Sequence, residues 1–364
     1  MAKETTLDKA RKTINEIDEK MRDLFIKRMR AVEQVAEYKK ERGMEIFDPA
    51  REAEIIKRGS ALVEDEVIRE YYVTFLRNNM NVSKAYQARL IEGMRVAYSG
   101  VEGAFAHIAA ERLYPSAVKV AYSDFTAAYK AVEVGECDVC VLPVENSYNG
   151  EVGQVTDLMF SGTLYVNGMF DLPVTQDLLG VKGAEISDIK TVVSHPQALG
   201  QCADYIREHG FEIKEHKNTA LAAREVSNLG DRSVAAIASA EAAELFGLDI
   251  IDHDINAQKT NTTRFAVFSR VPNKRIPNAQ NVYSVLFFTV RDEAGALARA
   301  VEIIGSHGFN LRSLRSRPMK ELLWQYYFYV EAEGDVQTER GTAMMEELEE
   351  YCDRLKFVGT YVKM

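Results

Sequence analysis

The sequence is poor in tryptophan, proline and cysteine, with one, eight and four of them among 364 residues. It has no unbroken apolar run of membrane-spanning length, and its first six residues contain no apolar signal-peptide core. Forty-five basic residues against 55 acidic ones give a formal net charge of -10, which disfavours a sequence-independent grip on phosphate backbones. We therefore expect a cytoplasmic protein with no membrane partner and no nucleic-acid partner.

Metal and cofactor motifs are also scarce. Only Cys137 and Cys140 have C-x-x-C spacing, and no second pair completes a zinc site. The pair lies in an apolar run that is typical of a buried strand, so we expect it to pack in a core. The six histidines show no metal-binding spacing, and the turn at 99–103 matches neither G-x-x-x-x-G-K-[ST] nor G-x-G-x-x-G. We predict no metal and no cofactor.

The N-terminal region predicts three helices. Apolar residues recur at helical spacing over 6–43 with no proline, and Gly43 supplies a stop. At about 1.5 Å per residue this helix exceeds about 50 Å, more than a small domain is wide, so its apolar stripe needs a second chain. Asp48 caps a second helix that starts at Pro49, and a third covers 65–92. We expect an all-α module that forms an intertwined homodimer.

Charged and polar side chains on these helices fall into a pattern. Arg28 and Lys39 are eleven residues apart, so they share a helix face about 16 Å apart and can bind opposite ends of one small dianion. Arg11 lies roughly 25 Å from Arg28 and can act only at a partner chain's site. Ser83 and Gln87, one turn apart, face the same way. The alternative is a helical bundle with solvated charges.

These segments resemble a known family. They resemble the all-helical chorismate mutases, which rearrange chorismate to prephenate. The resemblance lies in the runs at 7–18, 27–28, 38–39 and 48–52 and in Ser83-x-x-x-Gln87. Such a rearrangement needs a compact substrate conformer and donors aimed at developing oxygen charge. Because Gln87 keeps its amide donor at any ordinary pH, we expect activity without acid conditions. The resemblance implies carboxylate binding by Arg11 of the partner subunit, Arg28 and Arg51 with help from Ser83, ether-oxygen donors Lys39 and Gln87, and ring-hydroxyl contacts Asp48 and Glu52.

After Gly93 the pattern changes to short strands, near 139–142, 191–194 and 234–238, alternating with helices. This is typical of an α/β domain. The run Asn261-Thr-Thr-Arg-Phe265 places an amide, a hydroxyl and a fixed cation at the mouth of a predicted strand, a set that suits a small anionic substrate. An ordinary strand entry with a solvated arginine is the alternative.

Four segments, at 97–105, 142–152, 194–198 and 261–265, resemble prephenate dehydratases in the family's order. The resemblance implies two α/β lobes around a cleft, with the chain crossing near Val174 and back near Asp252. It also implies a reaction that expels a ring hydroxyl and carbon dioxide. A free hydroxyl is a very weak acid, so a threonine at this site more readily donates a hydrogen bond than a proton. The implied site comprises Thr263 toward the leaving oxygen, Arg264 as carboxylate anchor, Asn146, Ser147 and Gln197 as polar contacts, and Glu145 or His195 as the group that shapes proton supply.

The C-terminal region begins after a polar connector at 271–280. The sequence pattern there predicts the ferredoxin-like β-α-β-β-α-β order. The predicted strands are 282–290, 310–317, 323–330 and 357–362, and the predicted helices are 292–306 and 338–355. The segment resembles ACT regulatory domains that bind phenylalanine across a dimer interface. One position departs from that family, since Arg315 replaces the glutamate of its Glu-Ser-Arg-Pro signature. A base near the effector amine disfavours binding unless it points elsewhere. The resemblance implies effector contacts by Gly295, Ala296, Leu297, Ser316, Arg317 and Pro318.

We therefore expect a multidomain protein, with a mutase domain at 1–93, a dehydratase domain at 94–272 and an ACT domain at 280–364. Its expected function is bifunctional, converting chorismate to prephenate and prephenate to phenylpyruvate in phenylalanine biosynthesis, with phenylalanine as inhibitor and a dimer or tetramer as the assembly. Two alternatives remain: a dehydratase that prefers arogenate, and a non-catalytic amino-acid-sensing or solute-binding protein.

Overall fold

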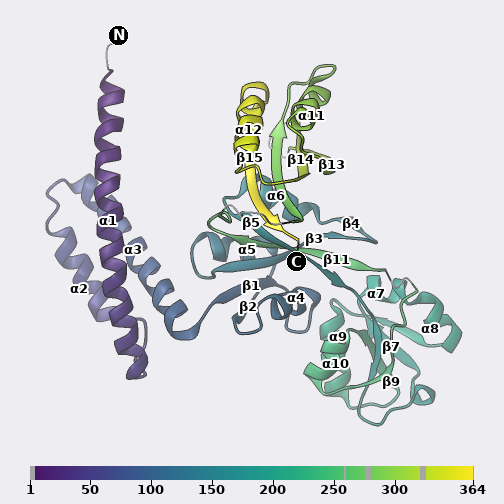
Figure 1. Cartoon of the computed structure of the whole chain (residues 1–364). Helices are drawn as coiled ribbons and strands as arrows, with labels where there is room; N and C mark the ends of the chain where they lie inside the picture. The colour runs from purple at the N-terminus through teal and green to yellow at the C-terminus, as the bar shows by residue number, and fades with distance from the viewer. Residues whose placement is uncertain (1–4, 258–259, 275–279, 320–324, 364) are drawn as a thin grey trace. The chain divides into compact units, whose positions relative to one another are not determined.

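The computed structural model describes residues 5–257, 260–274, 280–319 and 325–363. The chain divides into two compact units, Met1–Met94 and Arg95–Met364, and each is described by itself (Figure 1). No helix in the described ranges has the length and apolar character needed to cross a membrane.

The first unit consists of three helices, α1 (Thr6–Glu41), α2 (Pro49–Ser60) and α3 (Glu66–Glu92). Local sequence sets their ends. Thr5 and Asp8 form a reciprocal capping box at α1, and Asp48 and Asp65 accept backbone hydrogen bonds at the starts of α2 and α3. Gly93, with φ +96°, follows α3. The three predicted helices are confirmed.

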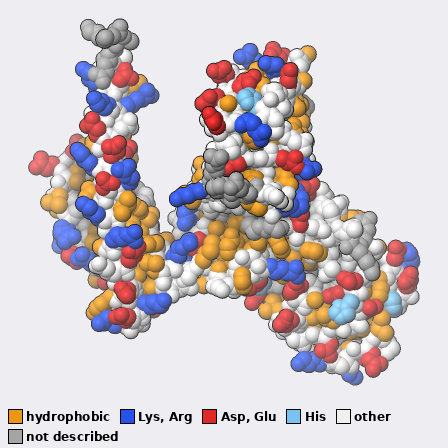
Figure 2. Space-filling view, in the orientation of Figure 1, with side chains coloured by type: hydrophobic (Ala, Val, Ile, Leu, Met, Phe, Trp, Pro, Cys, Tyr) orange, Lys and Arg blue, Asp and Glu red, His pale blue; other side chains and the backbone are white. Residues whose placement is uncertain are grey.

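Packing within this unit is uneven along α1. The C-terminal part of α1 lies against α3, where Ala36, Met80, Ser83 and Gln87 are buried. The N-terminal part leaves its large apolar side chains open, and Figure 2 shows hydrophobic atoms in orange among the charged ones on the surface of this unit. Those with 44 to 64% of their surface exposed are Leu7, Ile14, Ile17, Met21, Leu24, Phe25 and Ile26. At about 1.5 Å per residue, the 36 residues of α1 span about 54 Å.

The second unit begins with an α/β lobe. Its sheet has the order β2-β1-β3-β11-β5, with β4 paired to β3. β1 is parallel to β2 and β3, whereas β11 runs antiparallel between β3 and β5. The strands are β1 (Arg95–Ser99), β2 (Val118–Tyr122), β3 (Val139–Asn146), β4 (Gly150–Glu151), β5 (Tyr165–Pro173) and β11 (Thr262–Ser269), and the helices are α4 (Phe105–Leu113), α5 (Phe125–Glu133) and α6 (Gly153–Ser161).

A second α/β lobe lies between β5 and β11 in the sequence. Its sheet has the order β10-β6-β9-β7-β8, and its inner strands β6, β9 and β7 are apolar and largely buried, as expected for strands covered by helices. Its elements are β6 (Asp177–Gly180), η1 (Ile186–Asp188), β7 (Thr191–Ser194), α7 (Pro196–Gln201), α8 (Ala203–His209), β8 (Glu212–Glu215), α9 (Thr219–Leu229), β9 (Val234–Ala238), α10 (Ala240–Phe246) and β10 (Asp249–Asp252).

Two crossing segments join the lobes, one after Pro173 and the other after Asp252, as predicted. The crossings hydrogen-bond to each other. Val174 N donates to Asn261 O over 2.8 Å, and Ile255 N donates to Gln176 O over 2.8 Å. This pairing places the end of β11, with the Asn261 run, at the junction of the lobes.

The ferredoxin-like part has the predicted β-α-β-β-α-β order and an antiparallel sheet β13-β14-β12-β15. The predicted 323–330 strand begins outside the described residues. The elements are β12 (Val282–Thr289), α11 (Ala296–Ser306), β13 (Leu311–Pro318), β14 (Tyr326–Glu333), α12 (Glu339–Tyr351) and β15 (Arg354–Val362).

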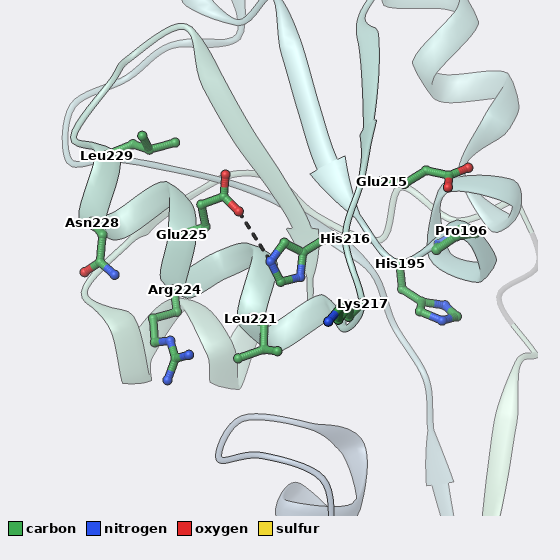
Figure 3. Close-up of a pocket in the computed structure, with 10 residues that line it drawn as sticks. All are labelled: His195, Pro196, Glu215, His216, Lys217, Leu221, Arg224, Glu225, Asn228 and Leu229. Carbon is green, nitrogen blue, oxygen red and sulfur yellow. Dashed lines mark ion pairs between the residues drawn. The ribbon is translucent and has the colours of Figure 1, made fainter.

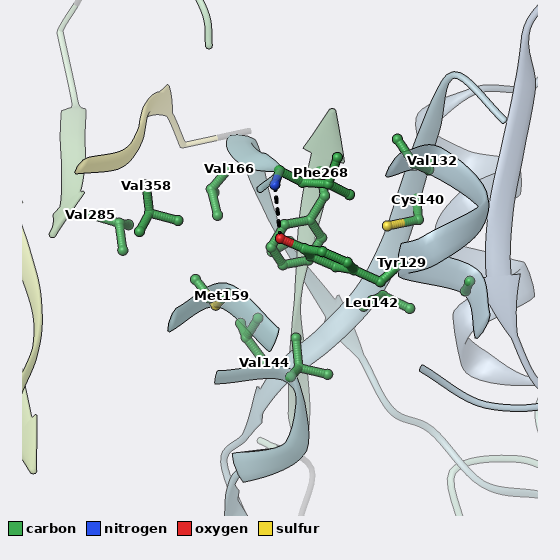
Figure 4. Packing of buried hydrophobic residues seen from close by; sticks show 14 of the residues in the cluster. Tyr129, Val132, Cys140, Leu142, Val144, Met159, Val166, Phe268, Val285 and Val358 are labelled. Carbon is green, nitrogen blue, oxygen red and sulfur yellow. Dashed lines mark hydrogen bonds between the residues drawn. The ribbon is translucent and has the colours of Figure 1, made fainter. Parts of the chain in front are cut away.

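One face of this sheet packs on the first lobe and shares its core. Val285 and Val358 lie in the same buried cluster as Tyr129, Met159 and Phe268 (Figure 4). Cys137 and Cys140 belong to that cluster, which confirms core packing for the C-x-x-C pair. At the junction, Gly359 has φ +148°, and a Cβ there would overlap the carbonyl oxygen of Val166 on β5.

Candidate active sites

The first candidate site lies between α1 and α3. The Arg28 guanidinium donates to Ser83 Oγ, and the Ser83 hydroxyl donates to Asn79 O over 2.8 Å. Burial lowers the pKa of Arg28 from its usual value, but the side chain remains a cation. Ser83 and Gln87, predicted to share a face, are both buried on it. One arginine and two polar side chains thus lie together where little water reaches them.

Gln87 is the group in this site with unused hydrogen-bonding capacity. Its amide nitrogen donates to Ser83 O over 3.3 Å, whereas its amide oxygen is buried and has no hydrogen-bond partner within the described parts of the chain. A buried polar atom without a partner costs free energy, so native structures rarely leave one unless something else binds it. The Gln87 amide is therefore available to a bound molecule.

The other residues predicted for this site differ in their exposure and in the partners that they already bind. Lys39 Nζ donates to Ile46 O over 2.6 Å, and Glu52 pairs with Lys84 over 2.8 Å. Asp48 is occupied as the α2 cap, and Arg51 is an exposed partner of Glu54 at 2.6 Å. Arg11 is exposed on α1. Sequence reasoning missed Lys84, although its place between Ser83 and Gln87 on α3 was a usable signal.

The second candidate site lies where β3 and β11 end. Thr263 is opposite Asn146 in the antiparallel register. Asn146 Nδ2 donates to Thr263 Oγ1 and to Asn261 Oδ1, each over 2.9 Å. Its Oδ1 accepts from the backbone N–H groups of Tyr148 and Asn149, each at 3.0 Å. The Asn146 amide therefore holds the β3–β4 turn and the Thr263 hydroxyl in one arrangement.

Ser147 closes the same corner. Its hydroxyl oxygen accepts from Thr262 N at 3.0 Å, and its own N–H donates to Thr262 O over 2.9 Å. Both Ser147 and Asn146 are thus beside the Thr263 strand, as predicted.

Asn261 adds a free donor to this site. Its side-chain nitrogen is buried and has no hydrogen-bond partner in the described part of the chain. A cavity of about 100 Å³ opens beside it, lined by Tyr148, Gly200, Gln201, Asn256, Ala257 and Asn261. A buried N–H donor next to a cavity suits an acceptor oxygen of a ligand. Tyr148, Gln201 and Asn256 were not predicted, because only the fold brings α7 and the crossing segment to this corner.

Arg264 and Glu145 lie on the other face of the sheet. Adjacent residues of a strand point to opposite faces, and these two are paired in register, next to the Thr263 and Asn146 pair. Arg264 Nε donates to Asp171 Oδ1 over 2.9 Å, and its Nη1 is 4.0 Å from Glu145 Oε2. The hydrogen bond with Asp171 raises the pKa of Arg264. The side chains of Arg264 and Glu145 thus point to the face of the sheet opposite to that of the Thr263 hydroxyl.

His195 lies in a different depression. It is the N-cap of α7, and its Nδ1 accepts from Gln197 N at 3.2 Å. It lines an open groove of about 960 Å³, in which Figure 3 shows His216 paired with Glu225 and His195 apart from that pair. None of the residues lining this groove also lines the cavity beside Asn261. Gln197 is exposed on the same short helix.

The predicted effector residues divide between two environments. Gly295, with φ +89°, precedes α11, where Ala296 is buried and Leu297 half-buried. Ser316 and Pro318 are exposed on β13. Arg317 turns toward the first lobe, where its Nε donates to Asp157 Oδ1 over 3.1 Å. Arg315 also turns toward the first lobe, where its Nη2 lies 2.7 Å from Glu145 Oε1.

Comparison with known proteins covers all three regions. The sequence matches the family described as chorismate mutase type II over residues 10–88, prephenate dehydratase over 96–273 and the ACT domain over 284–350. A bifunctional chorismate mutase/prephenate dehydratase of Aquifex aeolicus is 32% identical, across 98% of this chain and 98% of the relative. An arogenate dehydratase/prephenate dehydratase of Arabidopsis thaliana is 33% identical, and the alignment covers 74% of this chain and 72% of the relative.

A solved structure agrees with these matches. Prephenate dehydratase from Arthrobacter aurescens, in complex with L-Phe, has a TM-score of 0.67 and 27% identity, and covers 74% of this chain and 90% of its own. The three regions, in this order, define a multidomain enzyme of aromatic amino-acid biosynthesis. The chain belongs to the bifunctional chorismate mutase/prephenate dehydratases. Among the described residues, no three His, Cys, Asp or Glu side chains gather as a metal site.

Proposed function

We propose that the helical unit binds chorismate between α1, α2 and α3 and rearranges it to prephenate. Arg28, with its partner Ser83, binds one carboxylate, and Lys39 and the second N–H of the Gln87 amide nitrogen donate to the ether oxygen. Donors that meet this oxygen as the C–O bond breaks stabilise the charge that develops there, and no nucleophile is needed. We assign Asp48 and Glu52 to the ring hydroxyl, and Lys84 holds Glu52 in place. Arg51 is assigned to carboxylate binding.

We further propose that this site is completed in a homodimer. Arg11 lies on the exposed apolar part of α1, far along the helix from Arg28, and it serves as Arg11 of the partner subunit at the other carboxylate. The seven exposed apolar residues of α1 support such an assembly, since they are too many to leave in water on one helix.

For the dehydratase step, we propose a site centred on the Thr263 hydroxyl. The observation that carries this assignment is the Asn146 amide, which bonds Thr263 and Asn261 at 2.9 Å beside a cavity with an unpaired donor. The Asn261 N–H donates to a substrate oxygen, and Thr263 donates to the departing hydroxyl. Ser147 holds the turn, whereas His195 and Gln197 act from α7 if the lobes close on substrate. Arg264 and Glu145 act on the site from the opposite face, by fixing the two strand ends.

We assign phenylalanine to the ACT region as an inhibitor that binds at the Gly295 turn, with Ala296, Leu297 and Ser316 nearby. Arg317 and Pro318 then support β13 without touching the effector. The L-Phe complex of a structurally similar dehydratase supports this assignment. The expected cytoplasmic location and the choice of dimer or tetramer remain part of the proposal. So does the preference for prephenate over arogenate, which turnover of the two substrates side by side measures.

The test supplies chorismate alone and follows chorismate, prephenate and phenylpyruvate over time. We expect phenylpyruvate from the wild-type chain. Thr263→Ala should make prephenate at the normal rate and stop there. Thr262→Ala is the matched control, because its hydroxyl donates to Thr260 O over 3.3 Å and makes no other hydrogen bond with a described residue, and it should still make phenylpyruvate. Full dehydratase turnover by Thr263→Ala would remove this residue from the mechanism.

A further inference from the structure

Two arginines of β13 reach from the ACT region to the hairpin that carries the dehydratase site. Arg315 Nη2 lies 2.7 Å from Glu145 Oε1, at the end of β3. Arg317 Nη1 lies 3.5 Å from Glu151 Oε2, on β4. Glu145 and Glu151 are paired across the β3–β4 hairpin. The two arginines thus contact both strands of one hairpin.

The tip of this hairpin holds the groups assigned to the dehydratase step. Residues 146–149 form the turn, and Asn146 follows Glu145 directly. Consecutive strand residues are about 3.4 Å apart along the chain and fix each other's orientation through the shared peptide plane. The ion pair of Arg315 with Glu145 therefore restrains the strand end from which the Asn146 amide reaches the Thr263 hydroxyl at 2.9 Å.

Arg315 is itself held in place on the ACT side. Its guanidinium lies over the Tyr329 ring, 5.6 Å from the centroid, and Tyr329 is 7% exposed. The Tyr329 hydroxyl donates to the buried Glu331 over 3.1 Å. The Arg315 side chain is 27% exposed and that of Glu145 is 33% exposed, so water screens this ion pair only in part. Arg315 is a fixed point of contact, in contrast to a solvated surface cation.

We propose that Arg315 is a positioning residue of the dehydratase reaction, which acts through Glu145 to hold the Asn146 amide and the Thr263 hydroxyl in their reactive arrangement. Arg317 steadies the other strand of the hairpin in the same way. The inference rests on the proposed dehydratase site. It means that Arg315, a residue of the ACT region, contributes to the dehydratase reaction.

The experiment compares three full-length variants with prephenate as substrate. Arg315→Met keeps the stem that packs on Tyr329 but loses the charge, Arg315→Lys keeps the charge, and Arg312→Met is the matched control. Arg312 lies on the same strand and, with Glu145 and Arg315, lines a cavity of about 490 Å³, but its ion-pair partner is Glu333 of its own domain. We expect Arg315→Met to lower kcat about tenfold with KM and the melting temperature unchanged, because the contact acts on a transition-state donor. Arg315→Lys should recover most of the loss, and Arg312→Met should match wild type.

A double-mutant cycle with Glu145→Gln completes the test. If Arg315 acts through Glu145, the double variant should be no slower than the slower single variant. Independent losses that multiply, or an Arg315→Met enzyme with wild-type kcat, would overturn the inference. Thr263→Ala, run in parallel, separates the two proposals: its loss of turnover supports the site even where Arg315→Met has no effect, whereas its retention of turnover refutes the site itself.

Discussion

The two compact units bury their apolar residues to very different extents. In α1, Ala36 is the buried residue of a 36-residue helix, and the N-terminal part alone has seven large apolar side chains open to water. In the second unit, four of the five residues of β9 and the last five of β11 are buried. Apolar burial is the main favourable term in folding, at about 25 cal/mol per Å². The second unit thus has an extensive core of its own, whereas the helical unit leaves an apolar stripe exposed, which is the stripe that the proposed homodimer would bury.

This contrast predicts that one surface of α1 controls one activity and leaves the other unchanged. Leu24→Glu combined with Ile17→Glu should lower chorismate turnover at least about 100-fold, because charges in an apolar interface prevent association and remove Arg11 of the partner subunit from the site. Dehydratase turnover of added prephenate should stay near wild type. The measurements are the two assays on one preparation and sedimentation equilibrium.

The matched control for that variant is Glu19→Lys combined with Lys20→Glu, which changes exposed polar residues on the same stretch of α1. Full mutase activity in the Leu24 and Ile17 variant would show that the helical unit works as a monomer, and the contrast between the units would then lose its functional meaning.

A second prediction tests how closely the ACT sheet is joined to the first lobe. In Gly359→Ala, the added Cβ would overlap the Val166 carbonyl at a positive φ, so the free energy of unfolding of the second unit should fall by about 3 kcal/mol. Gly210→Ala also places alanine at a positive φ, of +68°, but in open space, and should cost only about 1 kcal/mol. Urea unfolding measures both, and equal losses would mean that the junction yields easily.

The fold could be predicted largely from local signals. Helical spacing over 6–43, the Asp48-Pro49 cap and the strand and helix order after 282 each depend on residues close in sequence, and the structure confirms them. The two crossings also followed the resemblance to known dehydratases, near Val174 and Asp252.

The site was less predictable because it depends on direction and on distance in sequence. Thr263 and Arg264 are neighbours, so the motif suggested one site, but the strand turns their side chains to opposite faces. Gln201 and Asn256 join Asn261 only through α7 and the second crossing. The Arg315 contact with Glu145 spans two domains, and no short pattern records such a contact.

A third prediction concerns how the helical site uses protonation. In Gln87→Glu, burial raises the carboxyl pKa, and only its protonated form donates as the amide does. Mutase turnover of this variant should fall about tenfold per pH unit above that pKa, whereas wild-type turnover should change little over the same range. Dehydratase turnover by the same chain is the internal control. A flat pH profile in Gln87→Glu would remove Gln87 from the ether-oxygen contact.

The smallest predicted effect is a pH dependence of stability that comes from thiols. It concerns the second unit alone, because all four cysteines are buried there. Burial raises the pKa of Cys202 to about 12 and that of Cys352 to about 11. A group whose folded-state pKa is raised stabilises the fold fully below its unfolded pKa of about 8.5, and this contribution is lost as pH rises toward the folded value. The free energy of unfolding of the second unit should therefore fall between about pH 9 and 11, by up to about 1.4 kcal/mol per pH unit for each thiol. Cys202→Ala should reduce this slope by one thiol's share in urea unfolding at several pH values, and a slope equal to that of wild type would mean that Cys202 ionises in the folded state.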